Sequence, residues 1–279
     1  MSRSGTKTIT WSGRIENQKG MEMIGEEEKS GHNYEQLVMC MQKFESKKQG
    51  CCELLDINEL GGINEMKIKE DKPEKAYLLI IRNGVDIMLD DVFMNTNDIW
   101  DELDSFEWDT KAWMKGRVVN KKARANVCIA DFSQRPDYEN KKGTVIDFAD
   151  LPVLSEIRKE LSGFLEGAKN MLAEGNYYTD LKQKEVGIGF HGDTERRKVI
   201  AMRFGESMDL HYQWFYKNDP IGKRVQVMLN DGDIYVMSEK AVGFDWMKKN
   251  SYTVRHAAHN LAKIDGNKED DERIKKNLR

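Results

Sequence analysis

The chain has 279 residues, of which 44 are Lys or Arg and 48 are Asp or Glu, giving a formal net charge of −4. Charged residues make up 33% of it and no run of about 18 apolar residues occurs, so the composition predicts a soluble protein and excludes a membrane-spanning helix. The opening residues lack the apolar stretch of a signal peptide, and the four cysteines have neither a disulfide-framework nor a paired C-x-x-C spacing. We therefore expect the cytoplasm or the nucleus as the compartment, and we expect the adjacent Cys51 and Cys52 to pack rather than to bind a metal.

The first 108 residues predict an α/β extension. They contain an extended opening at residues 8–11, a helical stretch at residues 34–46, a strand at residues 76–81 and an amphipathic acidic segment from Asp86 onward. No Pro-, Gly- or Ser-rich linker separates this part from the rest, so we expect it to pack onto the following domain as extra strands. A separate accessory domain is the alternative.

Charge is unevenly distributed along the next part of the chain, which ends in a helix expected at residues 152–165. Residues 86–109 contain nine acids and no Lys or Arg, whereas residues 111–142 contain nine basic residues and three acids. Trp113, Phe132 and Tyr138 are interleaved with the basic residues, a pattern that suits phosphate contacts and stacking of bases on aromatic rings. The alternative is that the acidic and basic runs pair with each other inside the folded protein.

Short strands at a regular spacing dominate the chain from residue 186. They are expected at residues 186–190, 198–204, 212–215, 224–229, 234–237 and 252–255, with turns at residues 218–222 and 230–233. Such a series predicts a small β-sandwich or barrel, whose mouth is a common place for a binding site.

Two histidines and one carboxylate lie at the ends of these strands. His191 and Asp193 follow the first strand as an H-x-D tripeptide, and His256 follows the last. Two histidines and one carboxylate form the facial ligand set of non-haem Fe(II) oxygenases, which leaves positions open on the metal. An isolated H-x-D occurs often in surface loops, so the surrounding strands carry much of this hypothesis. The chain has only five histidines, and we expect His211 and His259 to be ordinary buried or surface residues.

Four segments, in this order, resemble the double-stranded β-helix of AlkB-type Fe(II)/2-oxoglutarate dioxygenases. They are residues 189–196 (GFHGDTER), 217–220 (KNDP), 229–237 (LNDGDIYVM) and 255–256 (RH). The resemblance extends back to about Arg117, covers about half of the chain and points to an uncharacterised subgroup of that family. It implies an α+β protein with a double-stranded β-helix (jelly-roll) core at residues 175–263, within a dioxygenase domain at 109–263. Flanking helices, the N-terminal extension at 1–108 and a charged tail at 264–279 complete this expectation.

The resemblance also implies the cofactors. Fe(II) would be held by His191, Asp193 and His256, with 2-oxoglutarate as cosubstrate, O2 as oxidant and ascorbate as the reductant in an assay. Asn176 and Tyr178 match the family's Asn-x-Tyr, whose side chains hold the oxoglutarate.

The cation that anchors the oxoglutarate carboxylate is less well defined. The family places two arginines, separated by five residues, beyond the second histidine, and Arg273 and Arg279 have that separation. They follow a charged run at residues 265–272, which is typical of a solvated terminus. Lys263 and Arg255 are alternative anchors.

The reaction that the resemblance implies is oxidative N-demethylation or hydroxylation of a nucleic-acid base, single-stranded or duplex. Candidate substrate contacts are Glu195, Arg196, Tyr212, Trp214, Lys121, Lys122 and Arg124. Tyr212 and Trp214 are equally compatible with a place in the core. The same chemistry on a protein side chain, a small molecule or a lipid is an alternative, as is a binding module that has lost turnover. The sequence does not define an oligomeric state.

Overall fold

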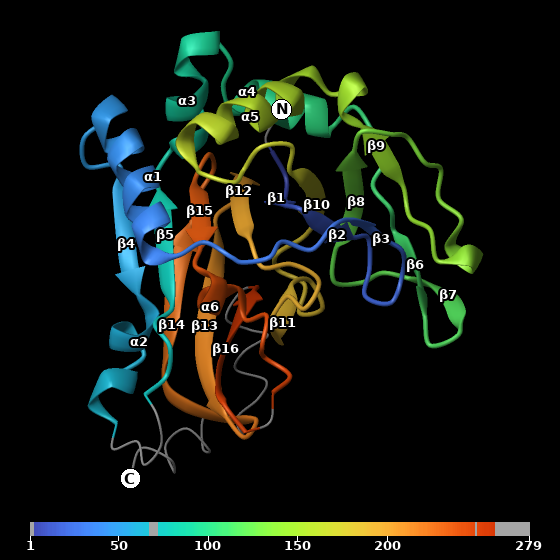
Figure 1. The fold of residues 1–279 in the computed structure, drawn as a ribbon. Helices are drawn as coiled ribbons and strands as arrows, with labels where there is room; N and C mark the ends of the chain where they lie inside the picture. The colour runs from blue at the N-terminus through green and yellow to red at the C-terminus, as the bar shows by residue number, and fades with distance from the viewer. Residues whose placement is uncertain (1–2, 67–71, 249, 260–279) are drawn as a thin grey trace.

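The computed structural model describes residues 3–66, 72–248 and 250–259 as an α+β protein with most of its strands in two sheets (Figure 1). The larger sheet contains, in spatial order, β4 (Cys52–Asp56), β5 (Tyr77–Ile81), β15 (Ile234–Met237), β12 (Val199–Gly205), β1 (Thr6–Ser12), β10 (Leu172–Tyr178), β8 (Ala125–Ala130) and β9 (Val145–Asp147). All neighbours in it are antiparallel except β8 and β9. The predicted α+β class is confirmed, but the strands of the described residues do not close into a barrel.

The smaller sheet has four antiparallel strands. In spatial order they are β11 (Ile188–His191), β16 (Tyr252–Ala258), β13 (Met208–Tyr216) and β14 (Asp219–Leu229). Two separate hairpins consist of β2 (Arg14–Glu16) with β3 (Met23–Gly25), and β6 (Lys111–Met114) with β7 (Arg117–Asn120).

The four longest α-helices cover one face of the larger sheet, and the smaller sheet packs against the other (Figure 1). The α-helices are α1 (Tyr34–Lys47), α2 (Ile57–Leu60), α3 (Gly84–Leu89), α4 (Thr96–Leu103), α5 (Pro152–Phe164) and α6 (Glu239–Val242). Short 3-10 turns lie at Ile63–Glu65, Asp90–Val92, Tyr138–Asn140 and Phe148–Asp150. None of the helices in these residues is long and apolar enough to cross a membrane.

The helix boundaries follow from local chemistry. Asn33 caps α1, since its side chain accepts from the backbone N–H of Gln36 while the Gln36 side chain accepts from the N–H of Asn33. Pro152 begins α5, at the position where a missing N–H costs nothing. The apolar faces of α1 and α5 then pack against the larger sheet.

The period-two alternation of the strands creates two separate cores. On β1, Ile9 and Trp11 point to the helices, whereas Thr8 and Thr10 face the smaller sheet. The other strands of the larger sheet divide in the same way: Ile200, Met202 and Phe204 of β12 join the helix-side core, and Val199 and Ala201 the inter-sheet core. Most strands of the larger sheet therefore contribute one row of side chains to the space between the sheets, whereas Cys128 and Ala130 of β8 and Val145 of β9 pack with Ile15 of β2.

The N-terminal strand β1 lies in the middle of the larger sheet. It pairs with β10 on one side and β12 on the other, so that Thr8 lies opposite both Asn176 and Arg203. The residues preceding 109 also contribute β4 and β5, which extend the same sheet beyond β15. The N-terminal part is thus built into the sheet that carries the later strands.

The predicted turn at residues 218–222 is too long. Only Lys217 and Asn218 form the connection, with φ of 51° and 67°, and β14 begins at Asp219. Positive φ at both central residues is the geometry of a two-residue hairpin turn that matches the strand twist. Asp, Pro and Gly in this segment suggested a longer turn, but Pro220 pairs with Phe215 at the sheet edge, and Gly222, with φ of 69°, lies in an irregular stretch of the β13–β14 pairing.

We expect Trp11→Ala to lower the free energy of unfolding by about 3–5 kcal/mol, because Trp11 is fully buried at the centre of the larger sheet and stacks on Phe148. Urea denaturation followed by circular dichroism measures the change. Met39→Ala, at an exposed position of α1, is the control and should change stability by less than about 0.5 kcal/mol. Equal effects from the two substitutions would contradict the central placement of β1.

Candidate metal centre

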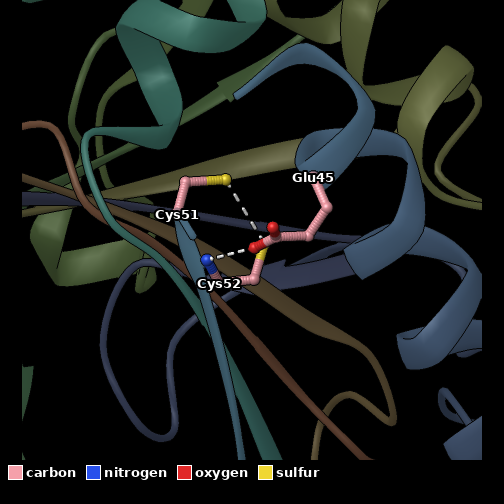
Figure 2. Close-up of side chains that lie close together, drawn as sticks. All are labelled: Glu45, Cys51 and Cys52. Carbon is pink, nitrogen blue, oxygen red and sulfur yellow. Dashed lines mark hydrogen bonds between the residues drawn. The ribbon is translucent and has the colours of Figure 1, made fainter. Parts of the chain in front are cut away.

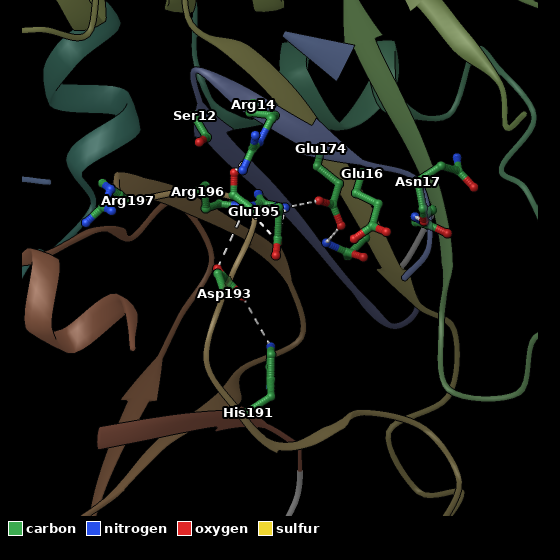
Figure 3. Close-up of polar contacts among 12 residues, drawn as sticks. Ser12, Arg14, Glu16, Asn17, Glu174, His191, Asp193, Glu195, Arg196 and Arg197 are labelled. Carbon is green, nitrogen blue, oxygen red and sulfur yellow. Dashed lines mark hydrogen bonds and ion pairs between the residues drawn. The ribbon is translucent and has the colours of Figure 1, made fainter. Parts of the chain in front are cut away.

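Neighbouring strands of the smaller sheet bring the three predicted metal ligands together. His191 ends β11 and pairs in register with His256 of β16. After Gly192 the chain bends so that the N–H of Asp193 donates to the carbonyl of Val242. A Cβ at Gly192 would lie 2.1 Å from the Gly243 carbonyl oxygen, so only glycine fits between His191 and Asp193. The H-G-D spacing therefore has a steric reason, and Figure 3 shows the His191 ring directed at the Asp193 carboxylate.

The ligand atoms lie close enough to share one metal ion. The Nε2 atoms of His191 and His256 lie 3.5 and 3.7 Å from Oδ1 of Asp193, and the three donor atoms lie within 4.8 Å of one another. For metal–ligand distances of about 2.1 Å, ligands at right angles lie about 3 Å apart. A small contraction around an ion is sufficient, so this donor set fits a transition metal.

Hydrogen bonding and burial prepare both imidazoles for this role. The carbonyl of Gly189 lies 2.8 Å from Nδ1 of His191, and a proton on Nδ1 leaves the Nε2 lone pair free for a metal. Burial lowers the pKa of His256 well below its usual range, and the neighbouring His191 and Arg196 lower it further. His256 is therefore neutral at physiological pH, the form in which imidazole binds metals.

The three ligands lie in the wall of a cavity of about 560 Å³ between the two sheets. Side chains from β1, β10, β12, β15 and β16, together with the β2–β3 hairpin, line it. The predicted cosubstrate residues Asn176 and Tyr178 are both on the cavity-facing row of β10. The metal ligands and the Asn-x-Tyr pair, which are distant in sequence, thus meet around one space.

Charged side chains form a buried network beside the metal ligands (Figure 3). Arg196 donates to Glu174 at 2.5 Å and lies 2.9 Å from Glu195 and 3.8 Å from Asp193. Glu174 in turn accepts from the Asn176 amide at 3.2 Å. Burial raises the pKa of the nearby Glu16 to about 7. The network connects the candidate metal ligand Asp193 to the candidate cosubstrate residue Asn176.

The residues predicted to contact substrate have different environments. Glu195, Arg196 and Arg124 line the cavity. Tyr212 and Trp214 are fully buried in the inter-sheet core, where the Trp214 indole donates to the carbonyl of Ile57. Neither side chain lines the cavity, so the core alternative describes these two aromatic residues.

The three predicted basic residues of the 121–124 segment also have different environments. Lys121 is turned inward, where it donates to the side chains of Asn126 and Asn17, and burial lowers its pKa to about 8. Lys122 is exposed. Arg124 donates to the Oδ1 of Asn176 and so belongs with the cosubstrate residues rather than with an outer substrate surface.

The predicted carboxylate anchors Lys263, Arg273 and Arg279 lie outside the described residues. Arg255, the other alternative, is directed away from the cavity, since it donates to Asn218 and covers the Phe215 ring. His211 and His259 are buried beside each other, and burial lowers the pKa of His211 to about 4.

Several residues that line the cavity were not predicted from the sequence. Thr8, Thr10, Glu174 and Arg203 line the space and were not singled out. A signal was present for two of them: Glu174 is two positions before Asn176, and Arg203 shares its strand face with Val199 and Ala201. The threonines had no such signal, because nothing local indicates where β1 pairs.

A second cluster contains side chains of types that can bind metals, but it is less suited to hold an ion (Figure 2). It consists of Glu45, Cys51 and Cys52. The two sulfurs lie 3.5 Å apart, and burial raises the pKa of both thiols, so they stay protonated. The Glu45 carboxylate accepts from the backbone N–H groups of Gly50 and Cys52, which lower its pKa. Because thiolates are the metal-binding form, these residues pack against each other instead.

Comparisons with known proteins identify one relative. No protein-family model matches the chain. An uncharacterized protein of Acanthamoeba polyphaga mimivirus is 42% identical over 252 residues, which span 90% of this chain and 94% of the viral protein. The match includes most of both sequences, so it reflects a fold shared over most of their length. The chain belongs to the same protein family as this mimivirus protein.

Proposed function

We propose that the chain is an AlkB-type dioxygenase that uses Fe(II), 2-oxoglutarate and O2 to hydroxylate a C–H bond, and that its substrate is a nucleic-acid base. The observation that carries this proposal is the convergence of His191, Asp193 and His256 on one wall of a large cavity. Two histidines and one carboxylate, with room beside them, are what a non-haem Fe(II) oxygenase requires.

The path of the chain supports a double-stranded β-helix, or jelly roll. From β10 onward, successive strands alternate between the larger and the smaller sheet, with the β13–β14 hairpin as the one interruption. Two facing antiparallel sheets connected in this way are typical of jelly rolls, which hold ligands between their sheets. In this proposal, β1 supplies the central strand of the larger sheet.

The residues of the chain have distinct tasks in the proposed reaction. When bound, Fe(II) and 2-oxoglutarate supply the activation of O2, with release of CO2 and succinate. His191, Asp193 and His256 hold the metal, and Asn176 and Tyr178 orient the cosubstrate. Hydroxylation of an N-methyl group on a base gives a hemiaminal, which breaks down to formaldehyde and the free amine.

An exposed basic face supports a nucleic-acid substrate. Seven of the nine basic residues between 111 and 142 are exposed, and they cluster on the β6–β7 hairpin and the loop around Tyr138: Lys111, Lys115, Arg117, Lys122, Arg135, Lys141 and Lys142. Among the described residues, no ion pair joins this basic face to the acids of residues 86–109. Of these seven residues, only Lys142 has an ion-pair partner among the described residues, Glu22 at 4.0 Å, so most of this charge is available to phosphates.

Metal binding is the first test. We expect the protein to bind one Mn(II) per chain under anaerobic conditions, and His191→Ala or His256→Ala to weaken this binding by more than about 10-fold, because each removes a ligand. Isothermal titration calorimetry measures it. The Cys51→Ser/Cys52→Ser variant is the matched control and should bind as the unmodified protein does; loss of binding in that variant alone would assign the metal to the other cluster.

Turnover is the second test. With Fe(II), ascorbate and 2-oxoglutarate, we expect succinate release and, on N-methylated oligonucleotides, stoichiometric formaldehyde release, whereas Asp193→Ala should give neither. Mass spectrometry of methylated oligonucleotides and methylated peptides, incubated in parallel, identifies the substrate class. Equal succinate from the enzyme and Asp193→Ala would rule out catalysis at this site, and modification of peptides alone would rule out the nucleic-acid substrate.

Nucleic-acid binding is the third test. We expect Lys115→Ala/Arg117→Ala to weaken binding of a fluorescent single-stranded oligonucleotide and to reduce the slope of log K against log salt by about 1 to 2, since two phosphate contacts are lost. Lys29→Ala/Lys223→Ala removes two exposed charges elsewhere and serves as the control. The absence of any binding at low salt would exclude this partner.

A further inference from the structure

Arg203 of β12 is a fully buried arginine in the wall of the cavity. Its Nη1 donates to the hydroxyl of Thr8 at 2.9 Å and lies 3.4 Å from the sulfur of Met208. Its Nε and Nη2 are buried and have no hydrogen-bond partner within the described residues. Burying a guanidinium whose Nε and Nη2 atoms lack hydrogen-bond partners costs folding free energy, because both its charge and its N–H groups have lost their hydration.

The comparison with Arg196 shows how unusual Arg203 is. Both arginines are buried and line the same cavity. Arg196 is compensated by the carboxylates of Glu174 and Glu195, whereas none of the described carboxylates forms an ion pair with Arg203. A buried arginine without an internal counter-ion is a ready binding site for an external anion.

The surroundings of Arg203 define the shape of that site. Thr8 lies directly across from Arg203 on β1, and Tyr178 and Tyr235 also line this part of the cavity. Burial raises the pKa of Tyr178, and raises that of Tyr235 to about 12, while the nearby charge of Arg203 acts in the opposite direction on both. The two phenols therefore stay protonated and can donate hydrogen bonds to an anion beside Arg203.

The other cationic side chains that line the cavity are less suited to bind an anion. Arg124 is already bonded to the Asn176 side chain, and Lys19 is exposed and lies over the Trp246 ring. Arg196 is neutralised by its carboxylates. Of the described cations that line the cavity, Arg203 alone combines full burial with unused donors.

We propose that Arg203, supported by Thr8 and Tyr178, binds the carboxylate of 2-oxoglutarate that lies farther from the metal. This inference rests on the proposed function and specifies its cosubstrate site. The guanidinium fork presents two N–H groups to the two carboxylate oxygens. The anchor then comes from β12 and the N-terminal strand β1, and not from Arg273 or Arg279, which have the family's spacing, or from the alternative Lys263.

The test compares two 2-oxo acids of equal length. 2-Oxoglutarate carries the second carboxylate, whereas 2-oxopentanoate ends in a methyl group. Calorimetric titration of each into the Mn(II)-loaded, anaerobic protein gives the ratio of their Kd values. We expect the protein to prefer 2-oxoglutarate by about 10- to 100-fold, and Arg203→Met to reduce this ratio to near 1 without changing Mn(II) affinity.

Further variants keep the test decisive. Arg203→Lys, which keeps the charge but loses the fork, should retain part of the preference. Thr8→Val removes only the hydroxyl and should reduce the ratio by about 3- to 10-fold, so it carries the test if melting curves show that Arg203→Met does not fold. Lys19→Met, at an exposed cation of the same cavity, and Arg273→Met are the controls and should leave the ratio unchanged.

The outcomes separate the two proposals. If Arg203→Met and Thr8→Val keep the full preference, or if Arg273→Met abolishes it, the anchor is elsewhere and this inference is wrong while the proposed function stands. If the Mn(II)-loaded protein binds neither 2-oxo acid, the proposed function fails together with the inference.

Discussion

The pairing of β1 between β10 and β12 is the constraint on which the rest of the structure depends. It joins the start of the chain to strands that follow more than 160 residues later, and it completes the larger sheet around its centre. Since side chains alternate across a strand, the same pairing sends Ile9 and Trp11 to the helix-side core and Thr8 and Thr10 to the cavity. The register of β1 against β10 and β12 therefore determines both the packing of the helix-side core and the residues that line the cavity.

Electrostatics then divides the cavity into regions. Arg196 forms ion pairs with Glu174 and Glu195 near the candidate metal ligands. Arg124 donates a hydrogen bond to Asn176. The Nε and Nη2 atoms of Arg203 have no hydrogen-bond partner among the described residues. Buried charges are tolerated where they are paired, so the exception indicates where a charged ligand belongs. The cavity thus has a wall with the candidate metal ligands and a cationic end, an arrangement that would suit a short molecule with an acid group at each end.

The sequence was sufficient for the parts of the site that have a local signal. His191, Asp193 and His256 could be found because they lie at strand ends and because H-G-D is a compact motif. Asn176 and Tyr178 were proposed through the resemblance, which also implied the α+β class, whereas the short strands were predicted from their periodicity. These features need only a few neighbouring residues to be recognised.

Other features depend on contacts between distant residues. Tyr212 and Trp214 were candidate substrate contacts, but the packing of the two sheets buries them in the inter-sheet core. An aromatic run in a strand does not show which of its side chains will face a cavity. Arg203 was read as part of a strand without a role, because its importance comes from the lack of a partner. The position of β1 could not be inferred, since a short extended segment pairs equally well with many strands.

The central position of β1 also has a consequence for how the protein is made. Thr8 is synthesised before Arg203, which donates to it and follows 195 positions later. Until β10 and β12 leave the ribosome, β1 has two unpaired edges and an apolar face with Ile9 and Trp11 exposed. Contacts of such long sequence separation form slowly, because the intervening chain must first be closed into a loop. The nascent chain therefore carries an unpaired, aggregation-prone strand until β12 has been made, and the cavity cannot form before that point.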